Sequence, residues 1–152
     1  MPDEIEVLLR HCENEWNKAR HSEEQRATMT NFIVLVAAGV LGLIGQLAFD
    51  TRSIPLALLL ILLGTYGAVT SAKLYERWQP HKTRARFWSS RIDELCPEAQ
   101  IRKQRESAWR HHKSRHPHLA KVRLHWLWVI LHALIAVLGL ACLATIIIVN
   151  WV

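Results

Sequence analysis

The chain has 152 residues, of which 51% are hydrophobic, and its formal net charge is +6 at pH 7. The length allows one domain, and the composition would be ordinary if it were spread evenly. It is not spread evenly, because three long segments contain no charged residue: 31–49, 54–72 and 126–152. The positive charge is therefore mainly a sign of how the chain is oriented, and direct nucleic-acid binding is not expected.

Each uncharged segment, as a helix rising about 1.5 Å per residue, is long enough to cross a hydrocarbon core of roughly 30 Å. The sequence therefore predicts an all-α integral membrane protein with three transmembrane helices. Only Asp-Thr-Arg-Ser at 50–53 separates the first two, which predicts a tight hairpin with Ser53 as N-cap and Pro55 in the next helical turn. The predicted parts are an amphipathic helix at 1–30, the transmembrane hairpin at 31–72, a basic helical region at 73–122 and the third transmembrane helix at 123–152.

The charges on the connecting segments predict the orientation. Segment 73–123 contains 14 lysines and arginines against 5 acids, whereas 50–53 contains one charge of each sign. Because positively charged loops stay in the cytoplasm, we expect the basic region and the N-terminus there, and the C-terminus on the outer side. Cys12 and Cys96 would then face a reducing compartment and Cys142 would lie in the bilayer, so no disulfide is expected.

The cytoplasmic segments show helix patterns of their own. Apolar residues at three- and four-residue steps predict an amphipathic N-terminal helix with one apolar stripe: Ile5, Leu8, Leu9, Cys12, Trp16 and Ala19. Ser22 followed by Gln25 predicts a new helix start, and hence a break near His21. Three prolines, Pro80, Pro97 and Pro117, predict helix ends, which would give three or four short cytoplasmic helices.

Two further patterns support the helices between these prolines. Four residues share one predicted helix face: Ala85, Trp88, Ile92 and Leu95. Two acid–base pairs have the four-residue spacing that supports a helix: Glu98 with Arg102, and Glu106 with Arg110.

All six glycines lie inside the predicted spans. Glycine disfavours helices, but small residues at three- and four-residue steps let membrane helices approach closely. The candidate helix-packing or oligomer-interface residues are Gly39, Gly42, Gly45, Gly64, Gly67, Ala68, Ser71 and Gly139. Two interpretations stay open, packing within the hairpin and packing between subunits, and the second predicts a homo-oligomer.

The predicted spans contain no Asp, Glu, Lys or Arg, and ion-coupled transporters or proton relays usually need one. A pore would be lined by small, hydroxyl and apolar residues, and the candidate pore or gate residues are Thr65, Tyr66 and His132. His132 has two open interpretations. One is a pore or sensor role, and the other is a side chain that reaches toward lipid headgroups behind Trp128.

A basic stretch precedes the third span, where Trp126 and Trp128 are expected at headgroup depth. Its candidate contacts with anionic lipid or another anionic ligand are Arg110, Lys113, Arg115, Lys121 and Arg123. Four histidines lie nearby: His111, His112, His116 and His118. They have no acid or cysteine among them and no zinc-finger spacing, so neither a metal site nor a cofactor is expected. A nucleotide ligand on this surface stays open, because phosphates are attracted by the same charges.

Catalytic signatures are absent from the sequence. It contains no glycine-rich phosphate loop and no GxSxG motif, and the acidic pair Asp93-Glu94 is interpreted as a solvated helix end. We therefore expect that the protein is not an enzyme.

The order of parts resembles the SLATT family of small bacterial membrane effectors. The resemblance covers about residues 5–95: the stretch "EWNKARHSEEQR", a short-looped hairpin, and a second span that continues into "KLYERWQPHKTRARFWSSRIDEL". It implies a pore-forming effector that damages the membrane in anti-phage defence. From this resemblance together with the glycine positions, the absence of catalytic groups and the polar segments on one side, we expect an oligomeric protein of the prokaryotic inner membrane. It would form a gated pore or disrupt the membrane when a nucleotide signal or a partner protein triggers it from the cytoplasm. The third span departs from the family's two-span layout. An alternative is a non-conducting anchor that docks a soluble defence or signalling complex through its basic cytoplasmic helices.

Overall fold

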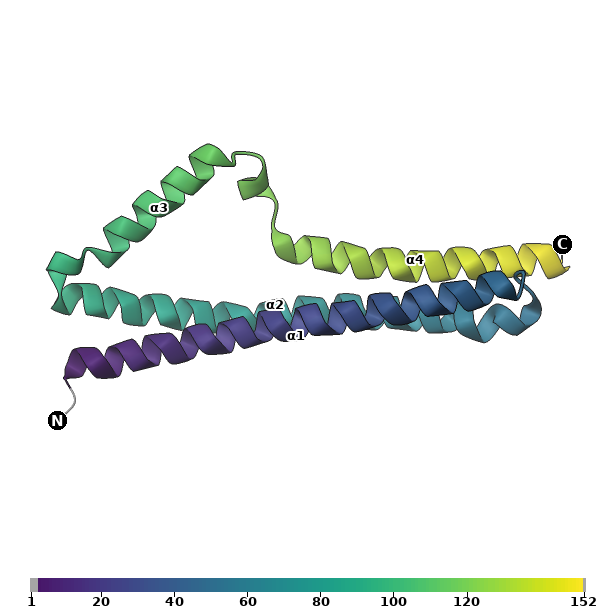
Figure 1. Cartoon of the computed structure of the whole chain (residues 1–152), viewed down its shortest axis with the longest axis horizontal. Coiled ribbons are helices and arrows are strands. Elements are labelled where there is room, and N and C mark those ends of the chain that lie inside the picture. Colours follow the sequence, from purple (N-terminus) through teal and green to yellow (C-terminus); the bar gives the residue numbers. More distant parts are fainter. Residues whose placement is uncertain (1–2, 152) are drawn as a thin grey trace. The chain divides into compact units, whose positions relative to one another are not determined.

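The structure is a computed structural model that describes residues 3–151, and these residues form helices and no strand. Three helices are long, α1 (Glu4–Gln46), α2 (Ile54–Leu95) and α4 (Leu124–Trp151), and one is shorter, α3 (Ile101–Arg115) (Figure 1). Short 3₁₀ turns lie at Thr51–Ser53, Pro97–Ala99 and Leu119–Lys121. The all-α prediction is confirmed, and α1, α2 and α4 each contain a segment long and apolar enough to cross a membrane.

The chain divides into two compact units. Unit 1 contains the described residues up to Glu23 together with Tyr75–Arg123, and unit 2 contains Glu24–Leu74 together with the described residues from Leu124 onward. α1 and α2 therefore contribute one part to each unit, whereas α3 belongs to unit 1 and α4 to unit 2.

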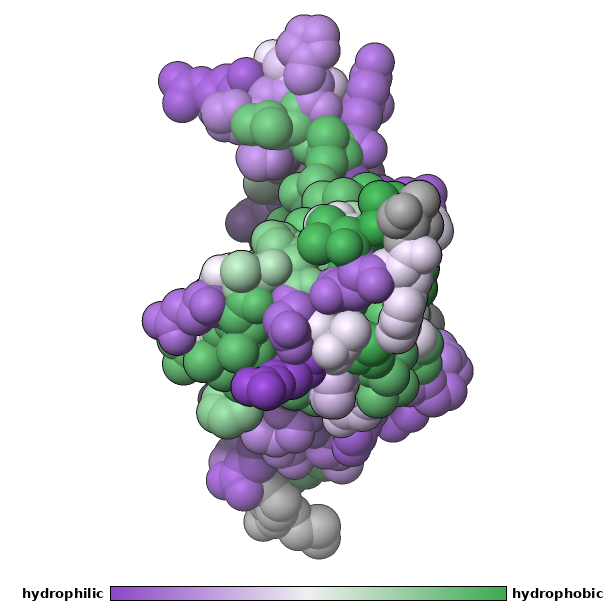
Figure 2. Space-filling model, turned by 90° about the vertical axis from the view of Figure 1, so that its right-hand side faces the viewer, coloured by the Kyte–Doolittle hydropathy of each residue, from purple (hydrophilic) through white to green (hydrophobic). Residues whose placement is uncertain are grey.

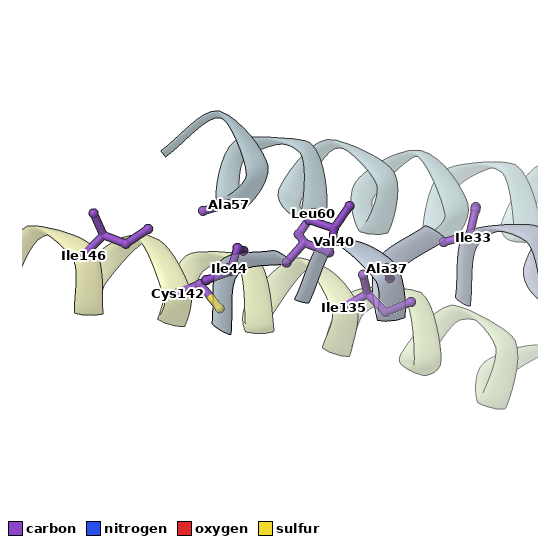
Figure 3. Packing of buried hydrophobic residues seen from close by; sticks show 9 residues of the cluster. All are labelled: Ile33, Ala37, Val40, Ile44, Ala57, Leu60, Ile135, Cys142 and Ile146. Atoms are coloured by element: carbon purple, nitrogen blue, oxygen red, sulfur yellow. The ribbon is translucent and has the colours of Figure 1, made fainter. Parts of the chain in front are cut away.

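The buried side chains of unit 2 follow one spacing on all three helices, with alternating steps of three and four residues. These buried positions include Thr30, Ile33, Ala37, Val40 and Ile44 on α1, Ala57, Leu60, Gly64, Gly67 and Ser71 on α2, and His132, Ile135, Gly139, Cys142 and Ile146 on α4. This spacing averages 3.5 residues, the repeat that keeps one face of a helix against its partner over many turns. The apolar members form the core of the unit (Figure 3).

In unit 1 the same spacing on α1 selects polar residues as well as apolar ones. Leu8, Glu15, Ala19 and Ser22 are buried there, and Cys12 is half-buried. The predicted apolar stripe is therefore wrong in two members, because Leu9 and Trp16 are 52% and 40% exposed. Hydrophobicity alone does not define the buried face of α1, because the partner helix contacts the positions of the 3.5-residue repeat whatever residue occupies them.

The predicted break near His21 does not form, because α1 is one continuous helix. Ser22 does not cap a second helix. Its hydroxyl donates a hydrogen bond to the carbonyl of Lys18 at 3.2 Å, one turn back in the same helix. A serine whose hydroxyl is satisfied in this way can stay inside a helix, so the start signal is overridden.

The predicted stop at Pro80 is also wrong, since α2 continues through it to Leu95. The proline is exposed, and the helix beyond it is held in unit 1 by the buried side chains of Ala85 and Ile92. This packing offsets the lost backbone hydrogen bond. Two of the predicted joints are confirmed, because α2 ends just before Pro97 and α3 ends just before Pro117.

The turn between α1 and α2 uses an unusual backbone. Ala48 and Phe49 have φ angles of 48° and 57°, a region that residues other than glycine rarely adopt. Asp50, not Ser53, caps the next turn by accepting a hydrogen bond from the Arg52 amide at 2.9 Å, and the Ser53 hydroxyl is buried without a hydrogen-bond partner. Figure 2 looks onto the end of unit 2 that carries this turn, where hydrophilic side chains lie among hydrophobic ones.

A side-chain hydrogen bond joins α4 to this turn. The Asn150 amide nitrogen donates to the carbonyl of Phe49 at 2.9 Å and to that of Ile146 at 2.8 Å. Because Phe49 is one of the residues with positive φ, this contact satisfies a carbonyl at the strained point of the turn.

Candidate functional site

Three glycines bring α2 and α4 together in unit 2. A side chain at Gly67 would overlap the His132 ring, a Cβ atom at Gly64 would lie 2.7 Å from the His132 carbonyl oxygen, and one at Gly139 would lie 2.8 Å from the Ile61 nitrogen. Real Cβ atoms essentially never show contacts below 3.0 Å, so a side chain would require a backbone shift at Gly64 and Gly139 and a shift of the His132 ring at Gly67. These glycines therefore pack α2 against α4 within the chain.

The other three glycines make no such contact. Gly39, Gly42 and Gly45 are exposed on α1, and a Cβ atom built on any of them meets nothing within 4 Å. Glycine inside a helix costs about 1 kcal/mol relative to alanine, so these residues weaken α1 without a packing gain inside one chain. We call these three residues the α1 glycine ridge.

His132 is fully buried in unit 2, with its ring against Gly67. Its Nδ1 lies 2.7 Å from the carbonyl oxygen of Trp128, and since a carbonyl only accepts, Nδ1 carries the proton. Its Nε2 has no hydrogen-bond partner. The interpretation of His132 as a side chain that reaches outward to headgroups is therefore wrong.

Other buried polar groups of unit 2 also lack a hydrogen-bond partner. The hydroxyls of Thr30 and Ser71 and the indole nitrogen of Trp128 are buried without a hydrogen-bond partner. The guanidinium of Arg26 lies 5.6 Å from the centre of the Trp128 ring. Unit 2 thus contains unsatisfied polar groups on all three helices, and each favours a state in which it reaches water or a polar partner.

The remaining pore candidates lie elsewhere on α2. Thr65 is exposed and its hydroxyl donates to the Ile61 carbonyl at 2.7 Å, and Tyr66 is 62% exposed. His132, in contrast, is enclosed between α2 and α4. One chain therefore does not bring the three candidates together. Of the other small residues on α2, Ser71 is fully buried and Ala68 is half-buried.

A network around Glu15 joins α1 to α2 in unit 1. The Glu15 carboxylate lies 2.7 Å from Nδ1 of His81, 3.2 Å from the ammonium of Lys18 and 3.6 Å from the guanidinium of Arg84. The hydrogen bond with His81 lowers the pKa of Glu15 most, burial acts in the opposite direction, and Lys18 and Arg84 lower the pKa further. The carboxylate is therefore ionised and held at neutral pH.

Asp93 has a structural role that the sequence did not reveal. Its carboxylate accepts hydrogen bonds from the backbone amides of Ile101 at 2.6 Å and Arg102 at 3.4 Å, so it satisfies two free amides at the start of α3. The interpretation of Asp93 as part of a solvated helix end is wrong. The signal was hidden because the cap lies eight residues before the helix, across the turn at Pro97–Ala99.

The predicted ion pairs of the α3 region do not form. Among the described residues Glu98 and Glu106 make no ion pair, and Glu98 lies in a 3₁₀ turn before the helix begins. α3 contains no buried residue. The basic residues predicted to contact anionic lipid or ligand are all exposed in unit 1: Arg110, Lys113, Arg115, Lys121 and Arg123.

Within residues 3–151, no group of three or more histidine, cysteine or acidic side chains is placed to hold a metal ion. The rings of His112 and His116 lie 5.2 Å apart, centre to centre, in a tilted arrangement. The chain matches no family model, no curated protein and no solved structure among those with which it was compared.

The two sets of glycines predict opposite effects of the same substitution. Gly67→Ala should destabilise the chain by about 1–3 kcal/mol, because the new methyl group overlaps the His132 ring. Gly42→Ala should leave stability unchanged or raise it by up to about 1 kcal/mol, because its methyl group meets open space. Denaturant titration of the detergent-solubilised chain measures both. Equal destabilisation would contradict the packing of α2 on α4.

Glu15→Gln should lower the unfolding free energy near neutral pH by roughly 1–2 kcal/mol, because the charged hydrogen bond with His81 is lost. Since the folded-state pKa of Glu15 lies below its ordinary value of 4.5, its contribution is present above pH 4.5 and is lost as the pH falls through the folded-state pKa. The difference between wild type and Glu15→Gln should therefore shrink in acid.

Glu13→Gln is the matched control, because Glu13 is an exposed neighbour that makes no ion pair within residues 3–151. It should change the unfolding free energy little at any pH. A difference between Glu15→Gln and wild type that stays constant below pH 4.5 would show that the carboxylate is not held in its charged form.

Proposed function

We propose that the chain is an oligomeric effector of the prokaryotic inner membrane, which opens a gated pore or disrupts the bilayer in anti-phage defence when it is triggered from the cytoplasm. The observation that carries this proposal is the α1 glycine ridge, where an added Cβ atom would meet no residue that the structure describes within 4 Å. The resemblance to the SLATT effectors supports the same function.

Placement in a membrane is supported by the surface of unit 2. Large apolar side chains are exposed on all three of its helices, among them Phe32, Leu35, Leu62, Ile148 and Val149, at 60–71%. An apolar surface of this kind is unfavourable in water and favourable in lipid. We propose that unit 2 lies in the bilayer. The charge distribution then favours unit 1 in the cytoplasm and the C-terminus on the outer side.

Assembly through the glycine ridge explains why three helix-weakening residues lie on an exposed face. In lipid, small residues let two helix backbones approach closely, and van der Waals packing between them drives association. The exposed Thr65 and Tyr66 would then be available to line a pore formed by several subunits. His132 would reach the pore only when α2 and α4 separate, which fits a gate better than a lining position.

The trigger would act on unit 1, which carries the charged surface. Its exposed basic residues on α3 and beyond fit contact with anionic lipid, and a nucleotide signal or a protein partner would supply the activating interaction. No step in this scheme requires a catalytic group or a cofactor.

A second function is favoured by α3. A helix with no buried residue contributes little to the stability of unit 1, so its exposed faces are free to bind a partner. The alternative is therefore a non-conducting anchor whose basic cytoplasmic helices dock a soluble defence or signalling complex.

Induced expression in a bacterium separates the two functions. The wild-type chain, together with its neighbouring gene products or during phage challenge, should depolarise the membrane and admit propidium. Gly42→Leu should abolish both self-association and depolarisation, because leucine separates the helices at the ridge. Ala144→Leu, the control, adds similar bulk at an exposed position of α4 and should retain both.

An intact membrane potential in every combination would leave the anchor as the better function. Unchanged self-association of Gly42→Leu would contradict assembly through the ridge, whatever happens to the potential.

A further inference from the structure

A groove in unit 1 has a lining that packing does not explain. It has a volume of about 490 Å³ and lies between Lys82 and Arg86 of α2 and Arg105, Glu106 and Trp109 of α3. Figure 1 shows these helices diverging from the turn that joins them. The volume falls in the range of small-molecule sites. Each helix contributes two residues four positions apart, Lys82 with Arg86 and Arg105 with Trp109, so each pair lies on one helix face.

The groove carries more positive charge than its surroundings neutralise. Lys82, Arg86 and Arg105 make no ion pair with any residue the structure describes, and Glu106 is the one acid in the lining. Burial lowers the pKa of Lys82 most and the neighbouring charge of Arg86 lowers it further, while Glu23 acts in the opposite direction. An anion in the groove would relieve this repulsion and accept charge-assisted hydrogen bonds from all three cations.

Trp109 gives the groove an aromatic wall. It is 56% exposed on a helix that buries nothing, so the core does not require it. Its ring stacks with His112 at 5.8 Å between centres and an interplanar angle of 27°. The Lys82 ammonium lies 4.2 Å from the centre of the Trp78 ring, on its own helix, whereas the two arginines have no ion pair within residues 3–151. An exposed indole beside these cations is a combination that binds a planar base attached to phosphate, because the base stacks and the phosphate pairs with the cations.

We propose that this groove between α2 and α3 binds a nucleotide. The phosphates contact Lys82, Arg86 and Arg105, the base stacks on Trp109, and Glu106 accepts hydrogen bonds from the ribose hydroxyls. Binding follows from the groove alone, whereas its role as the trigger of a membrane effector rests on the proposed function.

A lipid headgroup offers the same phosphate chemistry, but the lining favours the nucleotide. A headgroup would use the three cations and leave Trp109 and Glu106 without a role. The two sources differ in one measurable respect, since only a ligand with a planar base gains affinity from the indole.

Calorimetric titration of the full chain in nanodiscs of phosphatidylcholine tests the proposal, with ATP, GTP, adenosine and inorganic tripolyphosphate as probes. At least one nucleotide should bind more tightly than both adenosine and tripolyphosphate, and its affinity should fall as salt is added. Trp109→Leu should lower the affinity for that nucleotide about tenfold and leave the affinity for tripolyphosphate unchanged. Arg105→Gln should lower both affinities.

Lys103→Gln is the matched control, because it removes one charge from an exposed position of α3 outside the groove. It should leave every affinity within about twofold. Circular dichroism of each variant should show unchanged helix content, since Arg105 and Trp109 are exposed and their loss leaves no cavity.

Three outcomes would overturn the proposal. The first is that neither ATP nor GTP binds, the second is that tripolyphosphate binds as tightly as the nucleotide, and the third is that Lys103→Gln has the same effect as Arg105→Gln. A fourth titration uses nanodiscs that contain phosphatidylglycerol. Loss of nucleotide binding there would identify the groove as a site for lipid phosphate and would also overturn the proposal.

The binding assay needs no membrane damage, so the two proposals fail separately. Nucleotide binding without depolarisation in cells would leave the site and remove the effector function. Depolarisation by a chain that binds no nucleotide would leave the effector and remove this site as its trigger.

Discussion

The close approach of α2 to α4 is the contact on which unit 2 depends. Gly64, Gly67 and Gly139 have no side chains to hold the two backbones apart, and the His132 ring fills the space above Gly67. The contact encloses a histidine with one nitrogen unsatisfied, and the hydroxyl of Ser71 is buried on the same helix as Gly67 without a partner. A state in which α2 and α4 separate would lose the free energy of this packing but would gain the free energy of hydrating these polar groups. The two contributions therefore oppose each other. This opposition is the physical basis of the proposed gate.

The same residue type serves a different purpose on α1. The α1 glycine ridge faces outward, whereas the buried positions of that helix in unit 2 are filled by residues such as Ile33, Val40 and Ile44. α1 thus has one face that packs within the chain and another that is smooth and unpartnered. In unit 1 the inner face of α1 places Glu15 against His81, so a charged contact takes the position that an apolar pair holds in unit 2.

The three long apolar helices were predictable because their signal is local: an uncharged run of sufficient length can be recognised without knowing which helices pack against it. The continuation of α1 through Ser22 and of α2 through Pro80 was not predictable. The Ser22 hydroxyl is satisfied one turn back in its own helix, and the helix beyond Pro80 is held by buried side chains such as Ala85. The buried Glu15 was missed because the contact face follows the partner helix and not hydrophobicity.

For the candidate sites, the glycine positions were visible in the sequence, but which of them face inward was not, since glycine has no side chain to indicate a face. The groove lined by Lys82 and Trp109 could not be predicted from the sequence, because it depends on how two helices are placed. It exists only once the turn at Pro97–Ala99 and the cap from Asp93 have set α3 beside α2.

If the proposed assembly is correct, two copies of the chain meet at the α1 glycine ridge. Disulfide cross-linking in native membranes tests this claim, with Cys12, Cys96 and Cys142 replaced by alanine and a single cysteine introduced at position 42. Oxidation should yield a covalent dimer from Gly42→Cys and far less from Ala144→Cys, which is exposed on α4. Equal cross-linking at both positions, or none at position 42, would contradict the claim.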